Sequence, residues 1–226
     1  MKKKKKNKKK VKVRYGRIFL CFLLIGSIVY FVTSVFQFPI RNIYIEGNTI
    51  LSDQEIIDLV GIQHYPSIFS KTSKEMEKKL EKNIYIKKAT VKKKKLKEID
   101  IKIEENYPLF YDSSKGVTIL KDKREASQEL DAPYLINYIT DTIYNEFLDK
   151  MSQIDFSILK RISEIKYDPN SVDEERFLFT MNDGNYVYLT LIHLEKINNY
   201  VDILKNFENK KGILYLDSGE YFKVME

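Results

Sequence analysis

The chain has 226 residues, of which 39 are lysine or arginine and 32 are aspartate or glutamate, and its formal net charge is +7. The first 17 residues hold eleven of the basic residues and no acidic one, so the rest of the chain carries about −4. This asymmetry excludes a uniformly basic nucleic-acid-binding domain. The single cysteine, Cys21, excludes a disulfide scaffold and a cysteine-based zinc cluster, and two histidines leave little material for a histidine-rich metal site.

An uncharged apolar segment of 19 residues, from Ile18 to Phe36, follows the basic tail. As a helix it measures roughly 28 Å, close to the ~30 Å hydrocarbon core of a bilayer. A cleaved signal peptide is the alternative, but its apolar region is shorter and ends in small residues, which the sequence from Val35 to Pro39 lacks. The sequence therefore predicts a basic cytoplasmic tail over 1–17 and an uncleaved transmembrane helix over 18–38.

The charges on the two sides of this segment predict its orientation. Eleven positive charges precede it, whereas Arg41 is the one charge between Gln37 and Asn42. Positive charges stay on the cytoplasmic side, so we expect a single-pass type II protein whose bulk lies outside the cytoplasm. A nucleic-acid-binding arm is the alternative for the lysines between Lys2 and Lys10, but membrane topology already accounts for them.

The next stretch, 39–106, has the pattern of a small domain with the order strand, helix, helix, strand, strand. Ser52 and Glu55 form a capping box, in which each side chain can bond to the backbone of the other residue. Isoleucines alternate with charged residues over 99–104, which indicates a sheet with one face in water. The lysines of 92–95 are expected in a solvated turn. In chain order we expect a strand at 40–46, a helix from Ser52 to Gly61, a helix from about Thr72, and strands at 84–92 and 99–104.

The segment FPIRNIYIEGNTILSDQEIIDLVGI, residues 38–62, resembles the opening of a POTRA domain. The resemblance rests on the strand, the Gly-Asn turn and the capped helix, directly after a membrane span. It implies a module that binds other polypeptides, often along the edge of its sheet.

The remaining stretch, 107–226, predicts a mixed domain of short strands and two helices, so the fold class is α+β. Asn182-Asp183-Gly184-Asn185 separates two strands and indicates a hairpin with a type I′ turn, because Asp-Gly tolerates positive φ. The expected strands are 108–112, 116–122, 132–138, 162–168, 176–181, 186–191, 212–217 and 220–224, and the expected helices are 143–153 and one carrying Leu194, Ile197, Val201 and Leu204.

Three segments of this stretch resemble the β domain of the FtsQ/DivIB family of bacterial cell-division proteins. They are SEIKYDP (163–169), FLFTMNDGNYVYLTL (177–191) and EKINNYVDILKNFENKKGILYLDSGEYFK (195–223). The resemblance implies a scaffold at the division septum that binds small bitopic proteins of the FtsL and DivIC/FtsB types and helps couple them to septal peptidoglycan synthases. The alternatives are a POTRA-bearing transport or assembly component and a membrane-anchored cell-wall enzyme.

Residues that could carry catalysis do not form a recognisable group in the sequence. Cys21 lies within the predicted span, which excludes sortase-type chemistry, and Ser52 is used as a helix cap. His64 is expected in a loop and His193 at a helix start. No glycine-rich phosphate-binding motif is present. The sequence therefore predicts a protein that is not an enzyme and needs no cofactor or metal.

The last strand is expected to be a sheet edge, whose open N–H and C=O groups can receive a strand from a partner. The family resemblance implies the same location, around Asp217-Ser218-Gly219. The predicted partner-binding residues are Leu214, Tyr215, Leu216, Asp217, Ser218, Gly219, Tyr221 and Phe222.

Overall fold

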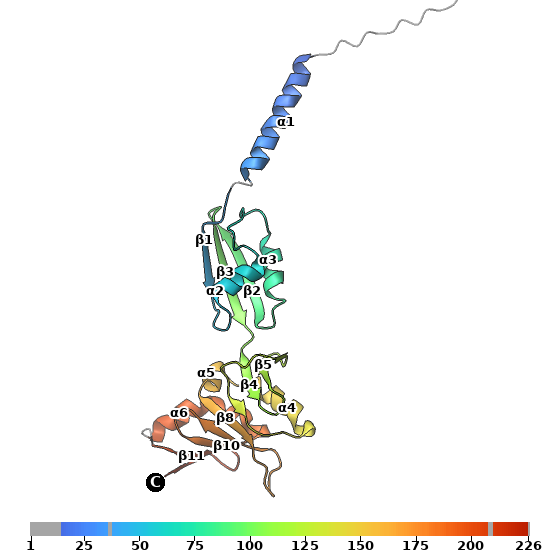
Figure 1. Cartoon of the computed structure of the whole chain (residues 1–226). Helices are drawn as coiled ribbons and strands as arrows, with labels where there is room; N and C mark the ends of the chain where they lie inside the picture. The colour runs from blue at the N-terminus through green and yellow to red at the C-terminus, as the bar shows by residue number, and fades with distance from the viewer. Residues whose placement is uncertain (1–14, 36–37, 208–209, 226) are drawn as a thin grey trace, which may run out of the picture.

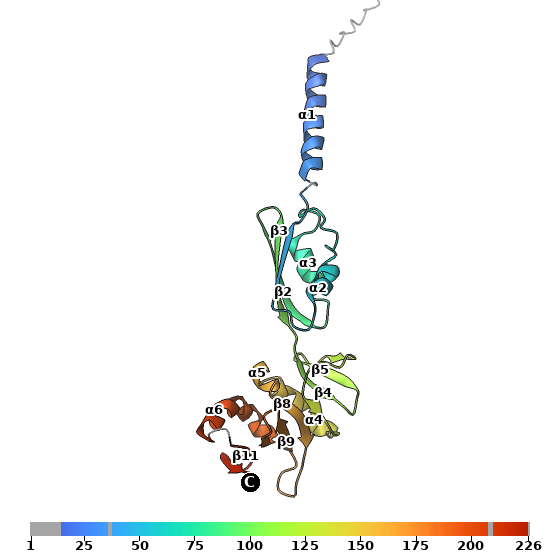
Figure 2. The same cartoon turned by 60° about the vertical axis from the view of Figure 1, so that its left-hand side comes forward.

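The structure is a computed structural model that describes residues 15–35, 38–207 and 210–225. Three parts follow one another along its length: the helix α1 (Tyr15–Val35), a three-stranded sheet with two helices, and a nine-stranded sheet with its own helices (Figures 1 and 2). The fold is α+β, as the sequence predicts.

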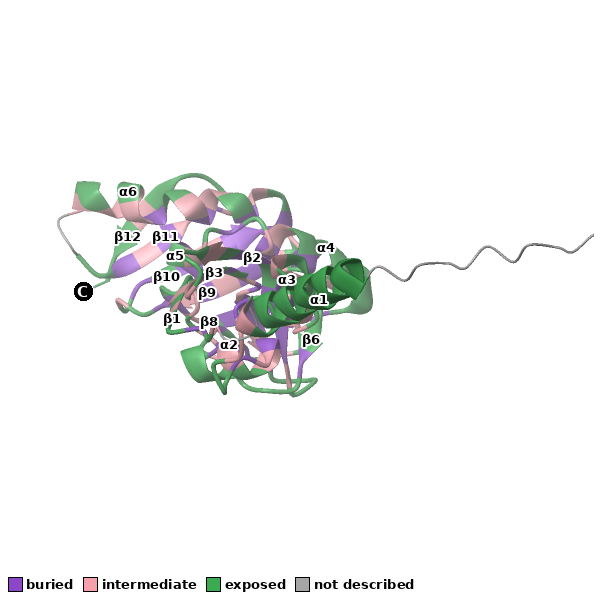
Figure 3. Cartoon of the chain, turned by 90° about the horizontal axis from the view of Figure 1, so that it is seen from above, coloured by how far each residue is buried: buried purple, intermediate pink, exposed green. Residues whose placement is uncertain are grey.

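Helix α1 is long and apolar enough to cross a membrane over Tyr15–Ser34. Its side chains are exposed from Tyr15 to Thr33, as the view from above shows (Figure 3). An exposed helix of this composition needs an apolar environment, which fits a single-pass membrane anchor. The helix begins three residues before the predicted span, and the end of that span includes Phe36 and Gln37, which lie outside the described residues.

The three-stranded sheet has the strand order β1-β3-β2, with β1 parallel to β3 and β2 antiparallel to it. The predicted capping box is present: Ser52 Oγ accepts from Glu55 N, and Glu55 Oε2 accepts from Ser52 N at 2.8 Å. Isoleucines 99, 101 and 103 are buried under the helices, so the predicted alternation is confirmed. The elements are β1 (Asn42–Glu46), α2 (Asp53–Val60), α3 (Ser73–Leu80), β2 (Ile86–Lys94) and β3 (Glu98–Glu105).

The prediction of a solvated turn over 92–95 is wrong for all but its last residue. Strand β2 continues to Lys94, which pairs with Glu98, and the turn starts at Lys95. Lys93 points toward the helices, where its Nζ donates to the carbonyl oxygens of Ile68 and Lys71. Burial lowers the pKa of Lys93. The strand period of two places every second lysine on the covered face, and loop carbonyls there accept its charge.

The nine-stranded sheet has the order β12-β11-β10-β9-β8-β7-β4-β5-β6. Its core lies between the sheet and the helices, where the ring of Phe147 stacks on Phe177 with centroids 4.8 Å apart. The strands are β4 (Pro108–Asp112), β5 (Val117–Leu120), β6 (Glu125–Ala126), β7 (Tyr134–Leu135), β8 (Ile162–Tyr167), β9 (Arg176–Met181), β10 (Tyr186–Thr190), β11 (Gly212–Tyr215) and β12 (Tyr221–Val224). The helices are α4 (Asp141–Met151), α5 (Phe156–Leu159), η1 (Leu191–Asn199), α6 (Tyr200–Leu204) and η2 (Lys205–Phe207).

Three details of this sheet differ from the sequence-based expectation. The strand expected over 132–138 is reduced to the two residues of β7, and the two residues of β6 were not predicted. The helix that carries Leu194 and Ile197 is a 3₁₀ helix through Asn199 and becomes an α-helix from Tyr200. Strands as short as β6 and β7 are set by pairing with distant strands, which no local pattern reports.

The hairpin between β9 and β10 is confirmed, but its turn is not type I′. A type I′ turn requires positive φ at both of its central residues. Gly184 has φ of +85°, but the φ of Asp183 is not positive. Gly184 N donates to Met181 O, and Met181 N donates to Asn185 O, each at 2.9 Å. This is a three-residue loop that ends in one left-handed glycine.

The two sheets meet at a short connection. Strand β3 ends at Glu105 and β4 begins at Pro108. The buried Asn106 donates from Nδ2 to Ile84 O at 3.0 Å and accepts at Oδ1 from Asp122 N at 3.2 Å. Its side chain therefore joins the loop before β2 to the loop after β5, while each sheet keeps a separate hydrophobic core.

Candidate functional site

The two sheets have four edge strands, β1 and β2 in the smaller sheet and β6 and β12 in the larger one. Strand β2 is covered, because Ala89 N donates to Glu81 Oε1 and Val91 N donates to Glu77 Oε1, both from helix α3 and the residue after it. Strand β6 is only two residues long. The two remaining edges are β1, with five residues in the smaller sheet, and β12, with four residues in the larger one. Strand β12 lies at the far end of the molecule from α1, where the sequence predicts the partner site (Figure 1).

The register of β12 shows which of its backbone groups face away from β11. Tyr221 pairs with Tyr215 and Val224 with Gly212. Met225 N donates to Lys211 O at 2.9 Å, so the residues bonded to β11 are Met225 and every second residue before it. The N–H and C=O groups of Phe222 and Val224 therefore point to the open side of the edge.

A close approach of two backbones holds β12 in place. An added Cβ at Gly212 would lie 2.3 Å from Lys223 O and 2.6 Å from the ring of Phe222. The ring of Phe222 packs on Phe207 with centroids 4.6 Å apart and contacts the main core. A side chain at Gly212 would thus force β12 away, so glycine is required there by contact rather than by φ.

A row of tyrosines crosses the solvent-facing side of the sheet and ends on β12. Tyr188 stacks on Tyr215 with centroids 5.4 Å apart, and Tyr215 stacks on Tyr221 at 4.6 Å. These pairs follow the strand register, because Tyr188 and Tyr221 both pair with Tyr215 from opposite sides. We call Tyr188, Tyr215 and Tyr221 the tyrosine row. Tyr221 is 50% exposed, so the row presents an aromatic surface beside the open edge.

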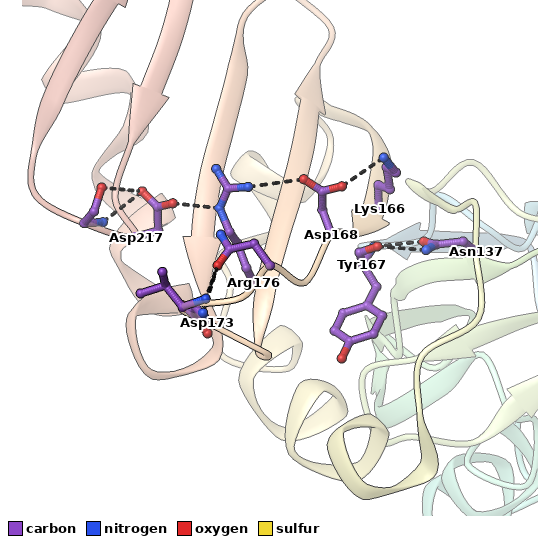
Figure 4. A network of polar contacts seen from close by, with 10 residues as sticks. Asn137, Lys166, Tyr167, Asp168, Asp173, Arg176 and Asp217 are labelled. Atoms are coloured by element: carbon purple, nitrogen blue, oxygen red, sulfur yellow. Dashed lines mark hydrogen bonds and ion pairs between the residues drawn. The ribbon is translucent and has the colours of Figure 1, made fainter.

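Arg176 packs against Tyr188, at the end of the tyrosine row that is farthest from β12. Its guanidinium carbon lies 3.6 Å from the centroid of the Tyr188 ring, which is a cation–π contact. Arg176 Nε donates to Asp217 Oδ2 at 2.8 Å and its Nη1 donates to Asp168 Oδ2 at 3.2 Å (Figure 4). Lys166 Nζ adds a second bond to Asp168 at 2.9 Å. This network ties the strands β8 and β9 to the turn before β12.

The hydroxyl group of Tyr215, in the middle of the tyrosine row, is neutral at ordinary pH. Burial raises the pKa of Tyr215, and the neighbouring Tyr221 and Tyr188 raise it further. A neutral phenol both donates and accepts a hydrogen bond, while its ring offers apolar area. The arrangement can therefore receive a partner strand at the edge and an apolar side chain against the rings.

The eight predicted contact residues have different positions. Leu214 and Leu216 are buried in the core, which the sequence-based list did not anticipate, because alternate residues of β11 face the helices. Asp217 is engaged by Arg176. Ser218 and Gly219 form the turn, and Ser218 N donates to Asp217 Oδ1 rather than to an open edge. The remaining three, on the strands themselves, are Tyr215, Tyr221 and Phe222.

Sequence reasoning missed several residues of this surface. Tyr188 and Arg176 belong to it although they lie 27 and 39 residues before Tyr215 in the chain. Tyr186 and Ile213 are register partners on the same face. A signal was available in β10, where Tyr186 and Tyr188 alternate with the buried Val187 and Leu189.

The residues considered for chemistry lie far from one another. Cys21 is exposed on α1, and His64 is exposed in the loop after α2. His193 Nδ1 lies 3.2 Å from Thr190 Oγ1 at the start of η1. Within 15–35, 38–207 and 210–225, no three His, Cys, Asp or Glu side chains are grouped so that they could hold a metal ion.

Comparisons with known proteins find a matching family model and several similar proteins. The family model described as "POTRA domain, FtsQ-type" matches residues 38–106. The chain is 30% identical to the cell division protein DivIB of Bacillus cytotoxicus, over 99% of this chain and 91% of that protein. It is 29% identical to DivIB of Bacillus subtilis, over 91% of this chain and 81% of that protein. A solved structure of the major extracytoplasmic domain of DivIB from Geobacillus stearothermophilus matches with a TM-score of 0.37 and 21% identity, over 46% of this chain and 96% of that one.

Proposed function

The chain belongs to the DivIB family of bacterial cell-division proteins, and from this premise we propose that it is a non-catalytic, membrane-anchored scaffold of the division complex. Helix α1 anchors it in the cell membrane, with the basic N-terminal tail in the cytoplasm and both sheets outside. It acts at the division septum, where it holds small bitopic partners of the FtsL and DivIC/FtsB types and helps couple them to septal peptidoglycan synthases.

The observation that carries this proposal is the open edge of β12 beside the tyrosine row. The outward N–H and C=O groups of Phe222 and Val224 can pair with an extended segment of a partner. Backbone pairing supplies affinity, while Tyr221 and Tyr215 offer rings on which alternate partner side chains pack. Buried tyrosines are among the residues that dominate interface energies.

The test removes one outward backbone donor. Val224→Pro deletes an N–H on the open side of β12, whereas the N–H groups that pair with β11 remain. We expect it to abolish or strongly weaken capture of co-expressed small bitopic division proteins from membranes. Val224→Ala is the matched control, because it shortens the same side chain and keeps the N–H, so it should bind almost normally.

Both variants should unfold at the temperature of the parent protein, because Val224 is half-exposed on the edge strand β12. Equal capture by Val224→Pro and Val224→Ala would contradict strand pairing at β12. A Val224→Pro protein with a lowered unfolding temperature and normal capture would mean that β12 has a structural role and the partners bind elsewhere.

A further inference from the structure

The smaller sheet is tied closely to the end of α1. Two residues, Phe36 and Gln37, separate the end of α1 at Val35 from Phe38. A chain extends by at most about 3.6 Å per residue, so Phe38 lies within about 11 Å of the helix end. The headgroup layer on each side of the hydrocarbon core is about 5–8 Å thick. If α1 spans the membrane, as proposed above, the nearest end of the smaller sheet must meet or nearly meet the headgroups.

The residues at that end are identified by the strand register. Asn42 pairs with Glu98, so the turn between β2 and β3 lies beside the start of β1, at the end that faces α1 (Figure 2). Arg41 N donates to Lys97 O at 2.8 Å. Phe38 contacts the ring of Phe69 edge-on with centroids 6.3 Å apart, and Lys97 Nζ lies 5.9 Å from the centroid of Phe38.

This end combines exposed apolar side chains with exposed cations. Leu96 is 55% exposed at the tip of the turn, and Phe69 is 46% exposed. Arg41 is exposed, and the side chain of Lys95 is 81% exposed, with Glu98 at 3.7 Å as its acidic neighbour. Apolar tips flanked by lysine and arginine are the composition of surfaces that insert shallowly into the membrane interface.

We propose that this juxtamembrane surface, formed by Phe38, Arg41, Phe69, Lys95, Leu96 and Lys97, rests on the outer leaflet of the membrane that α1 spans. Leu96 and Phe69 insert into the interface, and the three cations lie among the phosphate groups of the lipid headgroups. The occupant is a lipid surface because the covalent tether at Phe38 holds this end against one. The contact fixes the tilt of the smaller sheet, and it keeps β12, at the other end of the molecule, away from the membrane.

The test uses tryptophan as a depth probe, because the chain contains none. Leu96→Trp and Phe69→Trp are made separately in the full chain and reconstituted in vesicles of phosphatidylglycerol and phosphatidylcholine with brominated acyl chains. We expect a blue-shifted emission and a loss of intensity to the lipid bromines. Tyr138→Trp is the control, because Tyr138 is 57% exposed in the larger unit. Its emission in the vesicles should be neither blue-shifted nor quenched by the lipid bromines.

Charge is tested in the same vesicles. Adding Lys95→Glu and Lys97→Glu to Leu96→Trp should reverse most of the quenching when phosphatidylglycerol is present, since like charges then repel the surface from the phosphates. Quenching of Leu96→Trp no greater than that of Tyr138→Trp would overturn the proposal. Protection of Leu96→Trp from a water-soluble quencher without bromine quenching would also overturn it, because protein would then cover the surface.

A fourth probe separates this proposal from the membrane anchor on which it rests. Phe31→Trp lies on α1 and should be quenched by the lipid bromines whatever the smaller sheet does. Quenching of Phe31→Trp without quenching of Leu96→Trp contradicts the juxtamembrane contact alone. Absence of quenching at Phe31→Trp contradicts the anchor, and with it both proposals.

Discussion

Buried polar side chains at the turn between β9 and β10 tie three distant parts of the larger unit together. The buried Tyr200 donates from its hydroxyl to Asp183 Oδ2 at 2.8 Å and accepts from Asn185 Nδ2 at 3.0 Å. Asn185 Oδ1 accepts from Gly212 N at 2.8 Å. The turn thereby bonds to α6 and to the start of β11. In a protein interior such a network stabilises the fold only when every member is paired.

The pKa of Tyr200 makes this network sensitive to alkaline pH. Burial raises the pKa of Tyr200, and the bond to Asp183 raises it further. The unfolded chain loses the tyrosine proton at about pH 10 while the folded protein keeps it. The unfolded state then binds fewer protons, so the free energy of unfolding falls as pH rises above that value.

We expect Tyr200→Phe to flatten this alkaline dependence. At neutral pH the variant should lose about 1–3 kcal/mol, because Asp183 and Asn185 lose a partner. Between about pH 10 and 12 its stability should decline less steeply than that of the parent, as measured by urea unfolding at a series of pH values. Parallel curves for the two proteins would show that Tyr200 does not control the alkaline response.

The capping residues make a prediction for the smaller unit. We propose that 39–106 folds as an independent domain, since it has its own core and capped helices. Ser52→Ala should destabilise this fragment by about 1 kcal/mol, because Glu55 N loses its acceptor. Gln54→Ala, on the exposed side of the same helix, is the control with little expected effect. A fragment with the circular dichroism of a disordered chain would contradict the proposed boundary.

Strands β11 and β12 divide their side chains between two roles. Phe222 points toward Phe207 and the core, whereas the neighbouring Tyr221 stacks on Tyr215 in the tyrosine row. Adjacent residues of a strand face opposite sides, so substitutions one position apart should have different consequences. Substitutions of Tyr221 and Phe222 can therefore separate effects on partner binding from effects on stability within one strand.

Tyr221→Ala should weaken partner binding by ~2 kcal/mol and leave the unfolding temperature nearly unchanged, because its half-exposed ring contributes mainly to the interface. Phe222→Ala should lower the unfolding temperature, because it removes a ring that packs on the core. The measurement is partner affinity beside thermal unfolding for both variants. The opposite pattern, with Tyr221→Ala unstable and normal in binding, would exclude the tyrosine row as a contact surface.

At the scale of the whole molecule, the anchor and the two sheets form an elongated arrangement with α1 at one end and β12 at the other (Figure 1). The direct passage from β3 to β4 and the bonds of Asn106 join the two units without a long linker. The proposed partner edge is therefore held at a distance from the membrane, where partners that rise from the same membrane can reach it.

The proposed topology has a direct test. A reporter that is active only outside the cytoplasm should be active when fused after Glu226. Replacing most of the lysines between Lys2 and Lys12 with neutral residues should reduce that activity, because the charge difference across α1 sets its orientation. The intact protein should also keep its N-terminal lysines by mass. A mature form that starts near Gln37 would contradict an uncleaved anchor.

The sequence by itself determined the features whose causes lie within a few residues. The apolar length of α1, the capping box at Ser52 and the alternation of isoleucines in β3 are all present where expected. Periodicity and capping depend on residues at most four positions apart in the chain, so they can be recognised in the sequence without knowledge of the fold. The order of the five elements of the smaller unit followed from the same signals.

Only the tertiary structure decided which surfaces are open and what faces them. Strand β10 pairs in parallel with β11, which begins 22 residues after β10 ends, and that pairing aligns Tyr188 with Tyr215 and Tyr221. In the larger unit, alternate residues of β11 face the helices, which buries Leu214. In the smaller unit, the fold places Lys93 Nζ beside the carbonyl oxygens of the loop between α2 and α3. A strand's edge, its register and the covered face of each side chain depend on contacts with distant segments, because hydrogen bonds of a sheet are made between strands rather than within them.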